Sequence, residues 1–258
     1  MSDPGREMCE LLVVNDADRM QLNTPKVTTA LLLAAQEVLS LSADNIEAAI
    51  NERRKLGQTT QIHDYLVGFS PRERSDVYQK FVDSSREAAP SLLHDDVSYY
   101  LGALDSAVDV RFLTMTFGPE EQQEAKLAAS GLDKYPYVIT DTAAKAPVIA
   151  GWQQTELRLV LPRVSNNSKE LSVAACGVIL IDDKEGAFTG NGDRVGGFII
   201  KRPQEYPSID LTQVNCPPGT RVVAGLKPVL QAILPLAPFC RTEMVEVYWQ
   251  SGAGGQQN

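Results

Sequence analysis

The sequence predicts an α+β protein in which an N-terminal bundle of about five or six helices precedes a mainly antiparallel β-rich domain, a sandwich or a barrel. Before residue 132, apolar residues recur at helical spacing between helix-start signals. After residue 135, short β-branched runs alternate with proline and glycine turn signals. We therefore expect an acidic helical domain over residues 1–132, a β-rich domain over 133–250 and a flexible Gly/Gln tail over 251–258, with one continuous two-layer unit as the alternative.

The helices of the first half are predicted from their start signals. Asn23 and Pro25 precede a run with helical apolar spacing, so a polar cap is followed by proline in the first turn. Ser70 and Glu73 flank Pro71 at the spacing of a capping box. Residues 10–15 (ELLVVN) fit either a short strand or a helical turn. Further helices are expected over residues 42–57, 59–69, 91–108 and 119–130.

The strands of the second half are predicted from short apolar runs. Residues 171–181 are almost free of charge and rich in β-branched residues, which indicates a buried strand. Residues 195–200 form a second run, and the intervening Gly190-Asn191-Gly192-Asp193 is typical of a hairpin turn. Residues 156–161 alternate between apolar and polar, which favours antiparallel pairing with one wet face. Other strands are expected over residues 137–140, 221–224 and 243–249, with a short helix within 226–236.

The negative charge is unevenly distributed. Residues 1–132 contain 12 Lys and Arg against 21 Asp and Glu, whereas residues 133–258 contain 12 of each kind. An acidic surface repels phosphate backbones, so nucleic acid is not an expected partner of the first half. The basic triplet at residues 53–55 is interpreted as the last turn of a helix.

Compartment is inferred from cysteines and from segments that are missing. The four cysteines show no metal-binding or disulfide spacing. The sequence has neither a signal-peptide pattern nor an apolar run of the ~18 residues that suffice to cross a bilayer. We therefore expect a cytoplasmic protein with reduced thiols, in which the sequon at residues 166–168 carries no glycan.

Two histidines are present, and each is followed by aspartate. The segment LLHDD around His94 and Asp95 resembles the metal-dependent phosphohydrolases of the His-Asp kind. These are helical enzymes in which a first His, a later His-Asp pair and a still later Asp bind one or two divalent metals. The resemblance implies His63 as the first ligand, His94 and Asp95 as the pair, and Asp105 or Asp109 as the last. A divalent transition metal held in this way would activate a water molecule.

Each candidate site also has a local structural interpretation. The acidic residues after His94 can stabilise the positive end of a helix dipole without binding a metal. Asp182, Asp183 and Glu185 offer oxygen ligands for calcium, but they lack the spacing of calcium loops, so a solvated turn is predicted. The glycines at residues 190–197 are followed by a strand rather than a helix, which argues against a phosphate-binding loop. Trp152, Tyr248 and Trp249 are interpreted as core residues rather than partner anchors.

Because no catalytic constellation stands out, the sequence predicts a non-enzymatic assembly or interaction protein without a cofactor. Self-association into a homo-oligomer, or binding to another protein, would be its role, and a viral coat- or matrix-type subunit is the fold-level analogy. The alternative function is the metal-dependent phosphohydrolase using His63, His94 and Asp95. A third hypothesis is a small-molecule binding module at the mouth of the β-rich domain.

Overall fold

The computed structural model describes residues 10–42, 44–46, 48, 52, 62–86, 92–155, 158–160, 172–173, 175–190 and 195–236. The predictions for residues 53–55, 166–168 and 243–258 lie outside this set. The chain forms two compact units, each of which is discontinuous in sequence. Unit 1 comprises Met1–Gln21, Asp96–Thr116 and Tyr135–Asn258, and unit 2 comprises Leu22–Asp95 and Phe117–Lys134.

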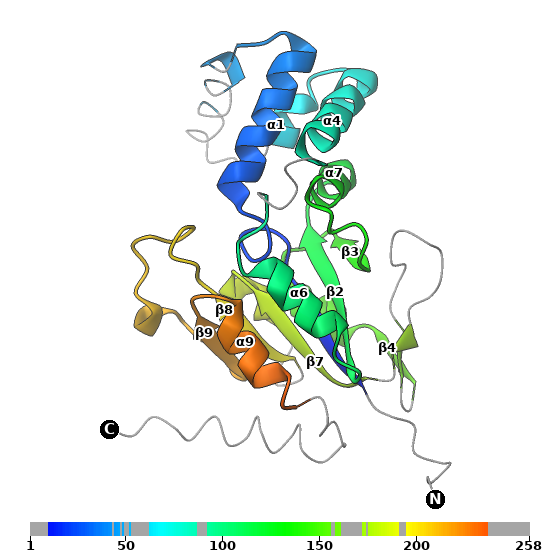
Figure 1. Cartoon of the computed structure of the whole chain (residues 1–258), viewed down its shortest axis with the longest axis vertical. Coiled ribbons are helices and arrows are strands. Elements are labelled where there is room, and N and C mark those ends of the chain that lie inside the picture. Colours follow the sequence, from blue (N-terminus) through cyan, green and yellow to red (C-terminus); the bar gives the residue numbers. More distant parts are fainter. Residues whose placement is uncertain are drawn as a thin grey trace, which may run out of the picture. The chain divides into compact units, whose positions relative to one another are not determined.

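Unit 1 is built on a six-stranded sheet with the order β3-β2-β1-β7-β8-β9 (Figure 1). The pairings β1 with β2, β1 with β7, β7 with β8, and β8 with β9 are all parallel. In the register of the central strand, Val13 lies opposite Phe112 on one side and Ile179 on the other. The strands are β1 Glu10–Asn15, β2 Val110–Phe117, β3 Tyr137–Thr140, β7 Ala175–Asp182, β8 Gly196–Ile200 and β9 Thr220–Val223.

The central strands of this sheet are apolar because both faces of the sheet are covered there. Every residue of β8 is buried, as are all residues of β1 after Glu10. Continuous burial of this kind is typical of parallel sheets, in which crossover helices pack on the faces. Figure 1 shows α6 (Val97–Asp105) and α9 (Leu226–Ile233) against one face. A core cluster joins Leu12 and Leu180 to α8 (Lys145–Ala150) and to the 3-10 turn Glu185–Phe188.

The predicted fold class is therefore wrong, because the chain has a parallel sheet with helices rather than a helical bundle followed by an antiparallel sandwich or barrel. Residues 110–117, which the prediction left without structure, form β2 next to the central strand. The strands β7 and β8 exist close to their predicted positions, but they pair in parallel instead of forming a hairpin. Antiparallel pairing occurs in a separate three-stranded sheet of β4 (Gln153–Thr155), β5 (Arg158–Val160) and β6 (Ser172–Val173).

Unit 2 is helical, and its described helices are α1 Thr24–Leu39, α3 Ile62–Leu66, α4 Pro71–Arg86 and α7 Glu120–Ser130. The helix starts predicted at Asn23 and Ser70 are confirmed. The Asn23 side chain accepts a hydrogen bond of 3.2 Å from the backbone N–H of Lys26. In the capping box, Glu73 Oε2 accepts from Ser70 N–H at 2.9 Å, and Ser70 Oγ accepts from Glu73 N–H at 3.3 Å. Local pairing of this kind explains why these helices were predictable.

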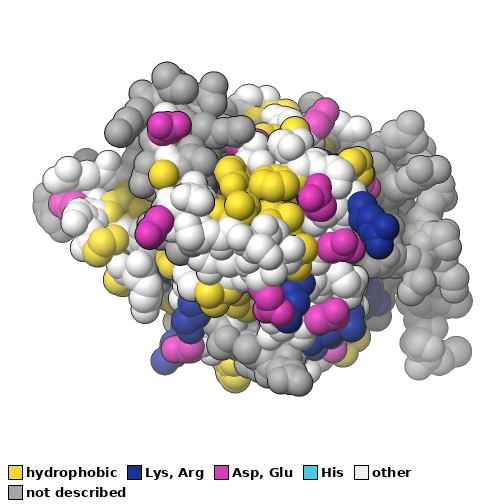
Figure 2. Space-filling model, turned by 90° about the horizontal axis from the view of Figure 1, so that it is seen from above, with side chains coloured by type: hydrophobic (Ala, Val, Ile, Leu, Met, Phe, Trp, Pro, Cys, Tyr) yellow, Lys and Arg dark blue, Asp and Glu magenta, His cyan; other side chains and the backbone are white. Residues whose placement is uncertain are grey.

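Several large apolar side chains are exposed on the described part of the surface. Leu33, Val67 and Tyr99 are the most exposed of the large hydrophobic residues together with Val108. On the face seen in Figure 2, a group of apolar side chains is bordered by acidic and basic ones. Isolated exposure of apolar residues is ordinary in folded proteins and does not by itself indicate a partner. None of the described helices is long and apolar enough to span a membrane.

Candidate active site

The strand order of the sheet identifies one position at which ligands are expected to bind. From β1 the chain continues to β2 and β3 on one side, and it then returns to β7, β8 and β9 on the other side. In open parallel sheets, the carboxyl ends of the strands on either side of such a reversal form a ligand-binding crevice. Asp16 directly follows β1, Asp182 is the last residue of β7, and Asp183 follows it. The sheet therefore brings three aspartates to its reversal point.

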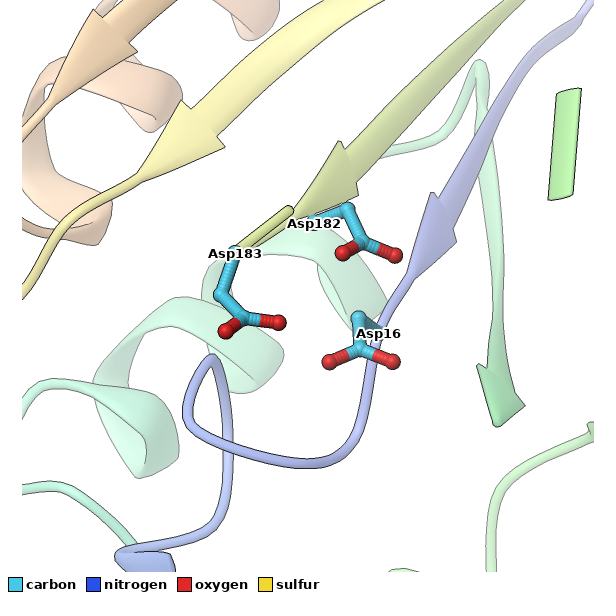
Figure 3. Close-up of side chains that lie close together, drawn as sticks. All are labelled: Asp16, Asp182 and Asp183. Atoms are coloured by element: carbon cyan, nitrogen blue, oxygen red, sulfur yellow. The ribbon is translucent and has the colours of Figure 1, made fainter. Parts of the chain in front are cut away.

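The three aspartates are buried and close together. One carboxylate oxygen of each lies within 4.8 Å of those of the other two, and Figure 3 shows the three side chains lying close together. Lys145, the first residue of α8, reaches the same cluster. Its Nζ contacts Asp16 Oδ1 and donates to Asp182 Oδ2 at 2.7 Å. One ammonium group therefore bridges two of the carboxylates.

The pKa values of the site reflect buried and incompletely balanced charge. Burial raises the pKa of the Asp16 carboxyl well above its usual value; Lys145 opposes this shift, whereas Asp182 and Asp183 add to it. Burial and then the neighbouring Asp182 also raise the pKa of Asp183. For Lys145, burial lowers the pKa, but the attraction of Asp16 and Asp182 outweighs it and the pKa is raised. The two carboxylates therefore favour the charged form of Lys145, and the carboxylates would in turn be stabilised by further positive charge.

A second group of side chains surrounds Asp183. The Tyr206 hydroxyl donates to Asp183 Oδ2, and it accepts a 3.0 Å hydrogen bond from Arg19. Lys201 Nζ donates to the backbone carbonyl of Asp183 at 2.5 Å and lies 3.2 Å from Glu185 Oε1. These contacts hold the turn after β7 in place, so the orientation of Asp183 is defined by groups on separate loops.

The loop after β1 is held by buried polar groups. Gln21 Nε2 donates to the backbone carbonyl of Asp16 at 2.9 Å and to Thr114 Oγ1 at 3.0 Å. Asn15 Oδ1 accepts from the Tyr100 hydroxyl at 2.7 Å. Within the described part of the chain, Asn15 Nδ2 and Gln21 Oε1 are buried and make no hydrogen bond. Leaving such atoms without a partner costs free energy, so they are exceptions in an otherwise hydrogen-bonded loop.

The donor set fits a hard divalent cation. Carboxylate oxygens are the ligands that Mg²⁺ and Ca²⁺ prefer, whereas imidazole suits transition metals. Asp16, Asp182 and Asp183 supply oxygen donors from a confined space. The expectation of no cofactor is therefore contradicted. The predicted solvated turn at Asp182 and Asp183 is also corrected, because both side chains are buried in the cluster.

The histidine and aspartate residues singled out from the sequence lie elsewhere. His63 belongs to α3 and His94 is buried ahead of α6, while Asp95 is exposed. Asp105 ends α6 and Asp109 precedes β2. None of these residues belongs to the carboxylate cluster. Metal binding by His63, His94 and Asp95 is not tested by these positions and stays a prediction.

His63 has a structural partner whose effect can be measured. Its Nδ1 lies 2.7 Å from the Tyr78 hydroxyl. Burial, followed by the nearby Arg74, lowers the pKa of His63 below its usual 6.5. Because protonation then favours the unfolded chain, we expect stability to fall as pH drops below about 6.5 and to level off below the folded-state pKa. An NMR titration of the His63 ring should give a pKa under 6.5, and a value at or above 6.5 would contradict the prediction. In the His63→Gln variant, the loss of stability below about pH 6.5 that His63 causes should disappear.

Sequence reasoning considered Asp182 and Asp183 as cation ligands but preferred a solvated turn, and it missed Asp16 and Lys145, although a signal for Asp16 was present. Two apolar runs are each followed within two residues by aspartate: residues 11–14 by Asn15 and then Asp16, and residues 178–181 directly by Asp182 and Asp183. Parallel strands carry their functional groups at their carboxyl ends, so the repeated pattern of a buried run followed by aspartate was informative. The signal was not used because the two runs were not assigned to one parallel sheet. Lys145 had no local signal, since its role depends only on where α8 begins.

Comparison with known structures identifies the fold. No model of a protein family matches the sequence, and no curated protein matches it. Among solved structures, a haloacid dehalogenase-like hydrolase from Burkholderia xenovorans LB400 is similar with a TM-score of 0.54 and 15% identity, over 87% of this chain and 97% of that chain. A HAD hydrolase from Bacillus subtilis bound to magnesium has a TM-score of 0.49 and 12% identity, over 87% and 99% of the two chains. A HAD hydrolase from Entamoeba histolytica has a TM-score of 0.48 and 12% identity, over 88% and 99%.

These findings correct the function predicted from the sequence. The analogy to a coat- or matrix-type subunit depended on a β-sandwich, whereas the described strands form a parallel sheet and a small antiparallel one. The expectation of a non-enzymatic assembly protein is contradicted, because the structures that share the fold are hydrolases. The His-Asp phosphohydrolases are not matched either, and their helical architecture differs from this sheet. The chain has the fold of the haloacid dehalogenase-like hydrolases.

Proposed function

We propose that this protein is a Mg²⁺-dependent hydrolase of phosphate monoesters. The observation that supports this most directly is the group of three buried aspartates at the reversal point of the sheet, with Lys145 beside them. In proteins, Mg²⁺ is typically held by one or two carboxylates together with phosphate oxygens of a substrate. An empty cluster of carboxylates repels an anionic phosphate, so a phosphate ester is a suitable substrate only when a cation accompanies it.

Asp16, Asp182 and Asp183 would hold the cation. When bound, Mg²⁺ would neutralise the carboxylates and stabilise the charge that develops on the phosphoryl oxygens. Lys145 keeps Asp16 and Asp182 oriented through its two contacts. It also provides a fixed positive charge at the reacting phosphoryl group. Preorganised charge of this kind is usually the largest single contribution to lowering the activation barrier of a reaction.

Asp16 is assigned as the nucleophile. One of its oxygens contacts Lys145 and the other, Oδ2, would attack phosphorus. A bond forms between Oδ2 and phosphorus, and the bond from phosphorus to the alcohol oxygen breaks. Water then attacks phosphorus in the resulting acyl phosphate, releasing inorganic phosphate and restoring the carboxylate. Covalent catalysis of this kind divides one difficult displacement into two easier ones.

Asp18 is assigned as the proton carrier. It lies two residues after Asp16, is half-buried, and is near enough for its charge to raise the pKa of Asp16. In the first step its carboxyl would give a proton to the departing alcohol oxygen. In the second step its carboxylate would take a proton from the attacking water, so the group returns to its starting state.

The proposal is tested by assaying the purified protein with p-nitrophenyl phosphate and Mg²⁺. We expect release of p-nitrophenol that falls by at least about 10²-fold after treatment with EDTA and returns when Mg²⁺ is restored, since the cation carries the main electrostatic stabilisation. A parallel assay measures halide release from 2-chloropropionate. Halide release without phosphatase activity, or phosphatase activity that EDTA does not change, would refute the proposal.

A further inference from the structure

Arg19 occupies an unusual backbone position at the carboxylate cluster. It lies three residues after Asp16, and its φ of 61° is in the left-handed region. That conformation is uncommon for a residue with a Cβ atom, whereas glycine adopts it readily. The chain nevertheless has arginine here, and the long side chain brings a positive charge to Asp183.

The guanidinium group is positioned through a tyrosine. Arg19 Nη1 donates to the Tyr206 hydroxyl at 3.0 Å, whereas its distance to Asp183 Oδ2 is 3.9 Å, which is too long for a hydrogen bond. The Tyr206 hydroxyl itself donates to Asp183 Oδ2. The hydroxyl therefore connects the cation with the carboxylate, and Arg19 does not form a two-pronged pair with Asp183.

Exposure separates Arg19 from the other cations of the site. The side chains of Lys145 and Lys201 are 3% and 5% exposed, whereas 42% of the Arg19 side chain is exposed. The buried lysines contact the carboxylates and the carbonyl of the cluster, so they balance internal charge. Arg19 is the cation among these three that a dissolved molecule can reach.

We infer that Arg19 binds a second anionic group of the substrate, so that the preferred substrates are small phosphate monoesters that also carry a carboxylate or another phosphate. The inference rests on the proposed function. A planar guanidinium pairs with either group through two parallel N–H donors. Because Tyr206 already restrains the side chain, little rotamer freedom remains to be lost on binding.

The test measures binding with probes that cannot be hydrolysed. Methylphosphonate, phosphonoacetate and methylenebisphosphonate share a phosphonate, and the last two add a carboxylate or a second phosphonate. We expect calorimetric titration in excess Mg²⁺, corrected for binding of each probe to Mg²⁺ alone, to show at least one of these two binding at least about tenfold more tightly than methylphosphonate. The tighter of the two identifies the second group as carboxylate or phosphate.

Matched variants locate the effect at Arg19. In Arg19→Gln the difference between the probes should disappear while methylphosphonate binding changes by less than about twofold, and the exposed Arg221→Gln should behave as wild type. Equal binding of the three probes to wild type, no binding at all, or an equal loss for every probe in Arg19→Gln would overturn the inference. Because no turnover is required, retained probe discrimination in a protein that fails to hydrolyse p-nitrophenyl phosphate would refute the proposed hydrolase function and leave the Arg19 site intact.

Discussion

The Asp16→Asn variant is expected to lose at least about 10³-fold in kcat for p-nitrophenyl phosphate, because an amide cannot form the covalent intermediate. The fold should survive because Asn is similar in size to Asp. Its neutral side chain also removes a buried charge, and burial already raises the pKa of the Asp16 carboxyl. Circular dichroism and the denaturation midpoint check this point. Activity within about tenfold of wild type would exclude Asp16 as the nucleophile.

Two controls make the result specific to the nucleophile. Asp76→Asn changes an exposed aspartate in α4 and should leave kcat unaffected. A single turnover of wild-type protein in water labelled with oxygen-18 addresses the covalent step directly. If water attacks phosphorus in the second step, the label appears in phosphate; if it attacks the carboxyl carbon, the label appears in Asp16. If a rapidly quenched sample shows turnover but contains no phosphate bound to Asp16, direct attack of water on the substrate would be favoured instead.

The Gly197→Ala variant is expected to destabilise unit 1 by about 3 kcal/mol or more. Gly197 lies in β8 opposite Leu180 of β7. An added Cβ would lie 1.8 Å from the Leu180 carbonyl oxygen and 2.8 Å from Phe188 Cε1. Because the first of these atoms belongs to the backbone of the strand that ends in Asp182, relief requires β7 and β8 to separate. Guanidinium denaturation followed by circular dichroism measures the change.

Gly102→Ala serves as the matched control. Gly102 is in α6, and no atom lies within 4 Å of the position that its Cβ would take. Alanine is favoured over glycine in a helix, so this variant should be more stable by about 0.5–1 kcal/mol. An unchanged midpoint in Gly197→Ala would show that the close approach of β7 and β8 can relax.

Features that depend on neighbouring residues could be predicted from the sequence. The capping box of Ser70 and Glu73 and the cap at Asn23 involve partners three residues apart, and both are present. The positions of β7 and β8 followed from apolar runs, because a buried strand needs no distant information to be recognised. No structure was predicted for residues 110–117, which form β2, because their burial depends on pairing with β1, which is distant in the chain.

By itself, the sequence determined where helices begin and which apolar runs are buried, because capping and burial depend on residues that are neighbours in the chain. Only the tertiary structure decided the pairing of the strands and the composition of the site. Val13 has partners at Phe112 and Ile179, which are distant in the chain, and no local pattern states whether such strands pair in parallel. Asp16, Lys145, Asp182 and Asp183 meet because parallel pairing brings the carboxyl ends of β1 and β7 to one edge, and that edge exists only once the sheet has formed.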